Sequence, residues 1–149
     1  MTSEQVFNLI AEFCEGTNQF HLNLERMNDQ DGKRYYNEIL KNNVEYRYGI
    51  YFICDSVDSK VLYIGKAGTL KNDGLYKSQN LIGRLNAPRG KYNNSFLHFK
   101  EMMNDNNFDN IIFRVFYSKN NFPPAYLEAI TLYNFYKTQG KLPKFNNEY

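Results

Sequence analysis

The sequence predicts an α/β fold of the α+β kind, in which helices flank a three-stranded antiparallel sheet. Three short runs at 45–54, 60–65 and 111–118 are rich in the aromatic and β-branched residues that favour strands. The segments around them carry apolar residues at helical spacing, and turn-forming residues separate the runs. We therefore expect the order β-β-α-α-β-α over 45–149, preceded by a helical extension at 1–44. A chain of 149 residues is long enough for one such domain with its own core.

Two helices are predicted in the N-terminal extension. Thr2 and Gln5 have the spacing of a capping box, in which each side chain accepts a hydrogen bond from the other residue's backbone N–H. The apolar residues that follow recur at helical spacing: Val6, Leu9, Ile10 and Phe13. Gly16 is expected to end this helix, and a second, weaker pattern predicts a helix over 33–41.

The remaining elements follow from turn and capping residues. The segment 66–80 is expected to be a loop because Gly, Lys and Asn dominate it, and a short helix should then end before Pro88. A helix over 95–103 should follow, with Ser95 as its cap. After the third strand, a proline pair opens a helix over 124–139.

The first two strands form a hairpin, and each carries a tripeptide with one glycine and one tyrosine: Gly49-Ile50-Tyr51 and Tyr63-Ile64-Gly65. Side chains alternate along a strand, so Val61, Tyr63 and Gly65 are expected to share a face. If the hairpin closes symmetrically about Val57, Tyr51 lies directly opposite Tyr63, roughly 4.5–5.5 Å away. The two phenols would then share one patch, with glycines at its ends that leave room for another molecule. The alternative is a cross-strand aromatic pair that only stabilises the sheet.

Composition narrows the class of protein. Cys14 and Cys54 are far apart and belong to no ligand-spaced cluster, which argues against a disulfide scaffold and a zinc site. A secretion signal and a run of about 18 apolar residues are both missing, so we expect a cytoplasmic protein without a membrane span. Residues 1–46 carry a net charge of −4 and residues 47–149 carry +6. The larger segment is therefore expected to present a basic face to a polyanion, and the 13 Tyr and 12 Phe suit either a core or a surface that stacks on bases.

The two tripeptides carry a resemblance to a known family. In the forms YGIYFI and LYIGKA, on adjacent predicted strands, they resemble the GIY-YIG nuclease family over residues 45–149. The resemblance implies a DNA endonuclease that uses Mg²⁺ or Mn²⁺ and hydrolyses phosphodiester bonds in double-stranded DNA. The absence of a long appended segment makes the chain most similar to the small stand-alone restriction endonucleases of the family, which often act as homodimers. Repair, structure-specific and mobile-element roles remain alternatives.

The resemblance also implies site residues. The family's arginine, on the helix after the second strand, matches Arg84, whose guanidinium suits a phosphate. Its metal-binding glutamate matches Glu128, which lies in a helix that is apolar nearly all round and is therefore expected to be buried. The alternative for Glu128 is a buried salt bridge, for example to Arg84. A late asparagine near the metal matches Asn146, with Asn147 as the other possibility.

Basic residues near these positions are expected to contact the DNA backbone: Lys66, Lys71, Lys77, Arg89 and Lys91. Ordinary solubilising charge is the alternative for each of them. Some family members carry a histidine one turn after the arginine, where this chain has Pro88. Any role that this histidine plays is expected to be either absent or supplied by another residue, for which Tyr92 and His98 are the candidates.

The mechanism implied by the resemblance is attack of water on a phosphodiester. Tyr51 is expected to be the general base, provided that Mg²⁺, Lys66 and Arg84 lower its pKa from about 10. Tyr63 would orient water or phosphate, Arg84 would hold the scissile phosphate, and Glu128 would hold the metal. Two alternatives are a nucleic-acid-binding module that does not cleave and a protein-interaction domain with 1–44 as its partner surface.

Overall fold

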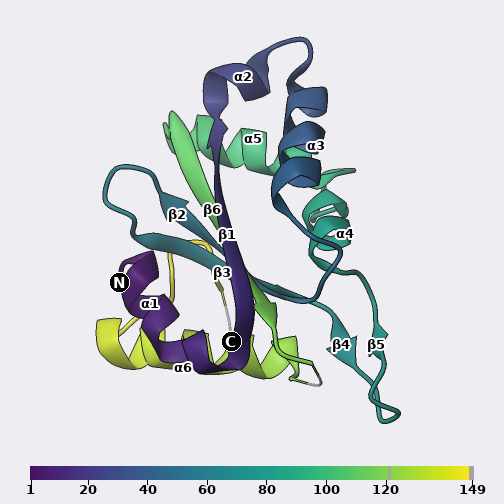
Figure 1. The fold of residues 1–149 in the computed structure, drawn as a ribbon. Helices are drawn as coiled ribbons and strands as arrows, with labels where there is room; N and C mark the ends of the chain where they lie inside the picture. The colour runs from purple at the N-terminus through teal and green to yellow at the C-terminus, as the bar shows by residue number, and fades with distance from the viewer. Residues whose placement is uncertain (121, 148–149) are drawn as a thin grey trace.

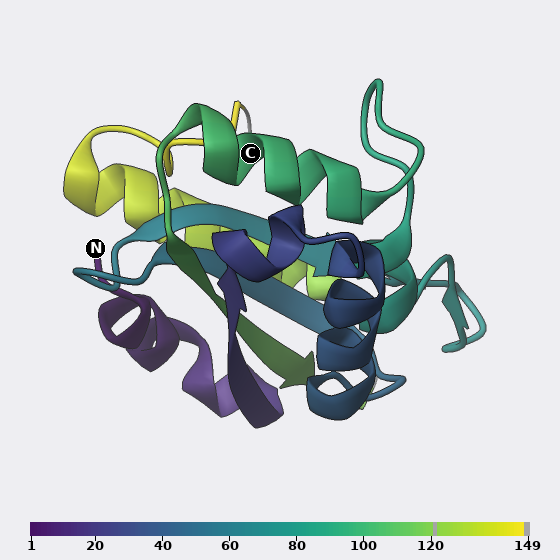
Figure 2. The same ribbon diagram turned by 90° about the horizontal axis from the view of Figure 1, so that it is seen from above.

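The computed structural model describes residues 1–120 and 122–147. Its centre is a four-stranded antiparallel sheet with the order β1-β6-β2-β3, covered by helices on both faces (Figures 1 and 2). The strands have these bounds: β1 Cys14–Asn23, β2 Gly49–Asp55, β3 Val61–Ala67 and β6 Asn110–Ser118. The predicted class, with helices flanking an antiparallel sheet, is confirmed, but the sheet has four strands and not three.

Helices α1 and α6 cover the lower face of the sheet in Figure 1, and α2 to α5 cover the upper face. The helices have these bounds: α1 Ser3–Ile10, α2 Leu24–Asn28, α3 Gly32–Asn43, α4 Leu81–Asn86, α5 Ser95–Asp105 and α6 Pro124–Gln139. A 3-10 turn, Ala11–Phe13, follows α1. None of the helices in the described part of the chain has the length and apolar character that crossing a lipid bilayer demands.

Strand β2 shows why the core has two halves. Ile50 and Phe52 belong to the cluster under α1 and α6, whereas Tyr51 and Ile53 belong to the cluster under α3 to α5. A strand that is buried on both faces has no need of polar residues at alternate positions. This explains the nearly continuous apolar run that marks this strand in the sequence.

The fourth strand, β1, lies in the segment predicted to be helical. Helix α1 ends at Ile10, and Gly16 lies within β1 and does not end the helix. Along β6 the register places Phe20 opposite Phe113, and the two rings stack with centroids 5.3 Å apart. The extension 1–44 therefore supplies the edge strand of the sheet as well as helices. The prediction of a purely helical extension is wrong because most of β1 is exposed and polar, which removes the alternation that reveals a strand.

The hairpin of β2 and β3 has a different register from the one expected. Tyr51 lies opposite Gly65, and Tyr63 lies opposite Ile53. An irregularity between Ile53 and Cys54 places one extra residue, Leu62, on β3, which moves every later pair by one position. For the same reason Val61 faces the opposite cluster from Tyr63, so the expected face of Val61, Tyr63 and Gly65 is wrong for Val61.

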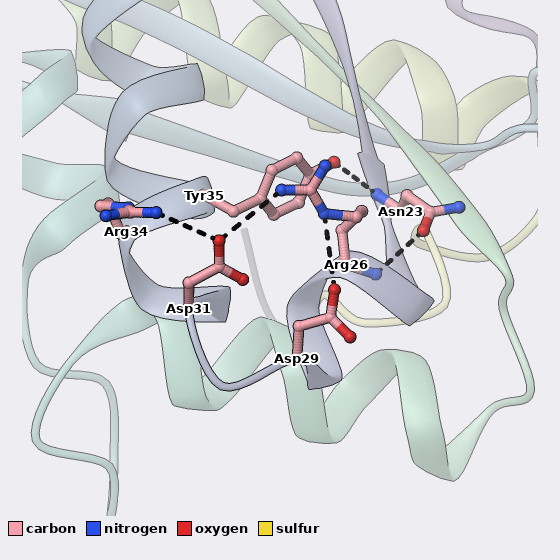
Figure 3. Close-up of polar contacts among 6 residues, drawn as sticks. All are labelled: Asn23, Arg26, Asp29, Asp31, Arg34 and Tyr35. Carbon is pink, nitrogen blue, oxygen red and sulfur yellow. Dashed lines mark hydrogen bonds and ion pairs between the residues drawn. The ribbon is translucent and has the colours of Figure 1, made fainter.

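Charged side chains fix the connection between α2 and α3, at the end of the molecule opposite to α6 (Figures 1 and 3). Arg26 lies 3.6 Å from the Asp29 carboxylate and 3.9 Å from that of Asp31. Arg34 contacts the same Asp31 oxygen at 3.4 Å. The hydroxyl of Tyr35 accepts a hydrogen bond from the backbone of β1 at 3.0 Å. At this end of the molecule, exposed acidic and basic groups are therefore already paired with one another, and such pairs contribute little to stability.

Gly49 is required by the backbone of the neighbouring strand. A Cβ at this position would lie 1.9 Å from the carbonyl oxygen of Phe116. We predict that Gly49→Ala lowers the free energy of unfolding by about 3 kcal/mol or more, because the backbones of β2 and β6 must separate. Gly140→Ala is the matched control: that residue has φ +70 but no neighbour within 4 Å of a Cβ, so about 1 kcal/mol is expected. Urea unfolding measures both, and equal losses would contradict the prediction.

Candidate active site

The predicted site residues meet around the outer edge of β3. Tyr63 packs on the α3-to-α5 side of this strand, where α4 supplies Arg84. Glu128 comes from α6, which covers the other face. A polar cavity of about 380 Å³ is lined by Tyr63, Lys66, Arg84 and Glu128 together. Four residues from three separated parts of the sequence therefore reach one space.

Two further cavities adjoin this one. A cavity of about 420 Å³ is lined by Tyr63, Glu128 and the tail residues Asn146 and Asn147, among others. The largest, of about 610 Å³, also includes Tyr63 and Arg84. Its lining residues are Ile53, Tyr63, Arg84, Pro88, Arg89, Gly90, Lys91, Tyr92, His98, Phe99, Met102, Lys144, Phe145 and Asn147. Tyr63 is thus common to all three cavities.

Tyr51 lies inside the protein and not on the cavity wall. Its side chain is fully buried, and its hydroxyl accepts a hydrogen bond of 2.5 Å from Arg89 Nη2. Burial raises the pKa of Tyr51 to about 12, and the nearby Arg89 guanidinium only partly offsets that rise. In the protein without a bound metal this pKa is therefore raised and not lowered, because the cost of burying a phenolate exceeds the attraction of the neighbouring cations.

The two tyrosines fill the space that the glycines were expected to leave open. Their ring centroids are 5.8 Å apart. A Cβ on Gly65 would lie 2.6 Å from the Tyr51 hydroxyl oxygen and 2.7 Å from a ring carbon of Tyr63. Gly65 therefore makes room for two phenol rings, not for another molecule.

Arg89 fastens the segment between α4 and α5 to the sheet. Besides Tyr51, its guanidinium donates to Ser95 Oγ at 3.0 Å and to the backbone carbonyl of Arg84 at 3.5 Å. The hydroxyl of Ser95 in turn donates to the Ala87 carbonyl at 2.5 Å. Arg89 was expected to contact DNA, but the structure commits most of its donors to these internal partners. Its position therefore fixes the position of the Arg84 backbone.

Glu128 is half-buried on α6 and has no direct partner among the residues that the structure describes. Among the described residues no hydrogen bond or ion pair reaches its carboxylate, so the alternative of a salt bridge to Arg84 is not present. Burial raises the pKa of Glu128, while Lys66 and Arg84 act in the opposite direction from a greater distance. Helix α6 is only partly buried, since Tyr126 and Tyr133 expose 51% and 50% of their surface. A desolvated carboxylate without a direct partner is the kind of group that a cation stabilises.

Asn146 completes the edge of β3 with its side chain. Its amide donates to the Ile64 carbonyl at 2.9 Å and accepts from the Ile64 N–H at 2.9 Å. The backbone N–H of Phe145 donates to the Leu62 carbonyl at 2.9 Å. Asn146 is thus engaged with the backbone, and the neighbouring Asn147 lines two of the cavities. Sequence reasoning could not separate the two because only their contacts differ.

The predicted DNA-contacting cations divide into two groups. Lys66, Arg89 and Lys91 line the cavities. Lys71 and Lys77 lie on a small hairpin of β4 (Thr69–Leu70) and β5 (Tyr76–Lys77), which projects from the body of the protein (Figure 1). The structure adds Lys144, in the tail, which the sequence did not single out because it is remote along the chain.

Tyr92 and His98 both line the largest cavity, with ring centroids 5.7 Å apart. Burial and the charge of Arg89 lower the pKa of His98 below its ordinary value of 6.5. Its imidazole is therefore neutral at physiological pH and available to accept a proton. Pro88 lines the same cavity, so His98 occupies space near the position at which a histidine was sought.

Comparison of the chain with models of known protein families, with curated proteins and with solved structures finds no match. The function must therefore be inferred from the residues and geometry of the site.

Removal of the Tyr51 hydroxyl tests its internal role. We predict that Tyr51→Phe lowers the free energy of unfolding by about 1–3 kcal/mol, because Arg89 loses a buried hydrogen-bond acceptor. The matched control is Tyr133→Phe, at a half-exposed position on α6, which should be neutral. Chemical denaturation compares the two, and unchanged stability of Tyr51→Phe would show that the hydroxyl does not support the fold.

The ionised carboxylate of Glu128 is expected to lower the free energy of unfolding when no metal is bound. Because burial raises its pKa, the folded protein binds this proton more tightly than the unfolded chain does. Ionisation at neutral pH therefore costs folding free energy, whereas below the ordinary pKa of 4.5 both states are protonated and the cost disappears. We predict that Glu128→Gln raises Tm in EDTA at about pH 7, and that the difference shrinks towards about pH 4. A lower Tm for the variant at neutral pH would mean that the carboxylate has a stabilising partner.

Proposed function

We propose that this chain is a metal-dependent DNA endonuclease of the GIY-YIG type, which hydrolyses phosphodiester bonds. The observation that supports it is the convergence of Tyr63, Lys66, Arg84 and Glu128 on one polar cavity at the edge of β3. This set combines a hydroxyl, two cations and a partly desolvated carboxylate. A phosphodiester, water and a divalent cation are the ligands that such a set suits.

The residues fit a divalent cation such as Mg²⁺ or Mn²⁺, and Glu128 would hold it. No cluster of three or more His, Cys, Asp or Glu occurs in the part of the chain that the structure describes. A single carboxylate leaves most coordination positions to water and phosphate oxygens, which suits Mg²⁺ better than zinc. When bound, the cation supplies Lewis-acid stabilisation of the negative charge on the phosphate and the leaving oxygen.

The protein groups have separate roles in this proposal. Arg84 binds the scissile phosphate through parallel hydrogen bonds, and Lys66 adds positive charge on the other side of β3. Tyr63 takes the role closest to the reacting atoms because its side chain lines all three cavities, and it orients the attacking water. His98 is the proposed proton acceptor, because its imidazole lines the largest cavity together with Tyr63 and Arg84. Tyr51 and Arg89 position Arg84 from within the protein.

Site-specific cleavage of the restriction type is the form of this function that we favour. The segment 66–80 adds the projecting β4–β5 hairpin beside the polar cavity, and this gives the protein a second surface for DNA. Because the described part of the chain has one site of this kind, cutting both strands of a duplex would require two copies. Cleavage as a homodimer is therefore part of the proposal.

The test is incubation of supercoiled and linear duplex DNA with the protein, in Mg²⁺ and in EDTA. Cleavage is expected in Mg²⁺ alone, and Arg84→Ala and Glu128→Ala should each reduce its rate by about 10²–10³-fold. Arg34→Ala and Glu38→Ala are matched controls on the exposed surface of α3 and should cut normally. Discrete fragments would identify a site-specific enzyme, and nicking or smearing would indicate repair or structure-specific cleavage.

Other outcomes would overturn the proposal. DNA binding without cleavage in any metal would identify a nucleic-acid-binding module, which the commitment of the Tyr51 hydroxyl to Arg89 would then explain. Self-association without any affinity for DNA would favour a protein-interaction domain with 1–44 as the partner surface. Cleavage that survives both Arg84→Ala and Glu128→Ala would place the active site elsewhere.

A further inference from the structure

The largest cavity has a charge pattern that the cleavage site does not require. Its volume is about 610 Å³, and four cationic residues are among those lining it: Arg84, Arg89, Lys91 and Lys144. Among residues 1–120 and 122–147, which the structure describes, no Asp or Glu lines it, although Glu128 lines both neighbouring cavities. An excess of positive charge with no carboxylate to balance it favours an anionic ligand.

The wall of the same cavity is apolar and aromatic. Phe99, Met102 and Phe145 line it, and Tyr92 stands near its rim. Two rim lysines lie against these rings: Lys91 Nζ is 5.3 Å from the ring centroid of Tyr92, and Lys144 Nζ is 5.3 Å from that of Phe145. Flat aromatic groups next to cations are what a ligand with a ring and a phosphate needs.

The walls are held in place by hydrogen bonds within the protein. The turn at 89–92 is closed by two backbone hydrogen bonds of 3.1 and 2.9 Å between Arg89 and Tyr92. Arg89 is itself anchored to Tyr51 and Ser95. In Figure 2 the connection between α4 and α5 stands beside the first turn of α5, away from the sheet. The cavity is therefore largely formed in the free protein, which lowers the entropy lost when a ligand binds.

We propose that this cavity receives a single nucleotide of the substrate, turned out of the DNA stack next to the cut. Its base would lie against the aromatic wall, and its phosphate would face Arg84 and the rim lysines. Free phosphate has no group that would contact the apolar wall, and an apolar peptide has no negative charge to interact with the four cationic residues. The volume lies within the range of cavities that hold ligands of nucleotide size. This inference rests on the proposed nuclease function and adds how the enzyme engages its substrate.

The first experiment compares binding to duplexes that differ at one nucleotide. After the cut has been mapped with the wild-type protein in Mg²⁺, the Glu128→Ala variant is titrated with duplexes that carry one abasic position each. Turning a nucleotide out of the stack costs a few kcal/mol, and an abasic position removes most of that cost. Binding should therefore tighten by about 10-fold at one position, at a fixed distance from the cut. If the enzyme cuts at many sequences, the abasic position should itself create a preferred cut at that distance.

The second experiment removes one cavity ring in the same Glu128→Ala background. Tyr92→Ala should weaken binding of the intact duplex by about 10-fold, because base–aromatic stacking contributes about 1–3 kcal/mol. The same substitution should not weaken binding of the abasic duplex that binds most tightly, because that duplex has no base to stack on Tyr92. Tyr46→Ala is the matched control, because Tyr46 is 78% exposed and lies outside the three cavities; it should change neither complex.

The outcomes separate this inference from the proposed function. Metal-dependent cleavage with no favoured abasic position would overturn the nucleotide cavity and leave the nuclease intact. Equal weakening of both duplexes by Tyr92→Ala would show that Tyr92 is a general DNA contact, and would also overturn it. Absence of cleavage during mapping would overturn the proposed function, and this inference with it.

Discussion

The outer edge of β3 has no neighbouring strand in the sheet. The arrangement of the site depends on which groups pair with the backbone of this edge instead. An edge strand presents backbone N–H and C=O groups without sheet partners. Here the extra residue Leu62 turns its carbonyl to the N–H of Phe145, and the Asn146 amide satisfies both backbone groups of Ile64. The tail therefore pairs with Leu62 and Ile64 on this edge, and the next residue, Asn147, lines two of the cavities. The edge position also lets α4 and α6 reach the same strand from opposite faces.

Two tyrosine–arginine pairs lie in different environments, one inside the protein and the other on the cavity walls. Tyr51 and Arg89 are joined by a hydrogen bond inside the protein, where burial keeps the phenol protonated. Tyr63 and Arg84 line the cavities, where solvent and ligands can reach them. The inner pair supports the outer one directly, since Arg89 bonds to the Arg84 carbonyl and the ring of Tyr51 packs against that of Tyr63. A buried charge-assisted hydrogen bond is expensive to break once formed, so it holds the outer residues in a defined position.

Elements that a local sequence pattern determines could be predicted from the sequence. Elements that depend on contacts between residues far apart in the chain could not. Strand β2 was evident from its apolar run, and α6 from its opening proline and closing glycine. Strand β1 was missed because it is an exposed edge whose pairing with β6 spans most of the chain. The register of the hairpin differs from the expected one by two positions: the loop closes between Asp55 and Lys60 and not symmetrically about Val57, and the extra residue Leu62 adds a second shift. Arg84 and Glu128 line one cavity, but no local feature of the sequence distinguishes Arg84, which lines that cavity, from Arg89, which is hydrogen-bonded to Tyr51 inside the protein.

The small net charge of the protein conceals a separation that bears on how a polyanion would approach. At the α2–α3 end, Asp29 and Asp31 are paired with Arg26 and Arg34, so the charges of these two arginines are already balanced (Figure 3). At the cavities, cations outnumber acidic groups, and DNA would be drawn to that side. Tyr63 and Arg84 line both the polar cavity and the largest one, so a nucleotide held in the largest cavity would place its phosphate at residues shared with the cleavage site. A base that fits poorly would then displace that phosphate from Arg84, and small displacements of a reacting group lower rates more than they lower affinity. Under the proposed function, recognition of one nucleotide and hydrolysis of the adjacent bond would be linked through the same two side chains.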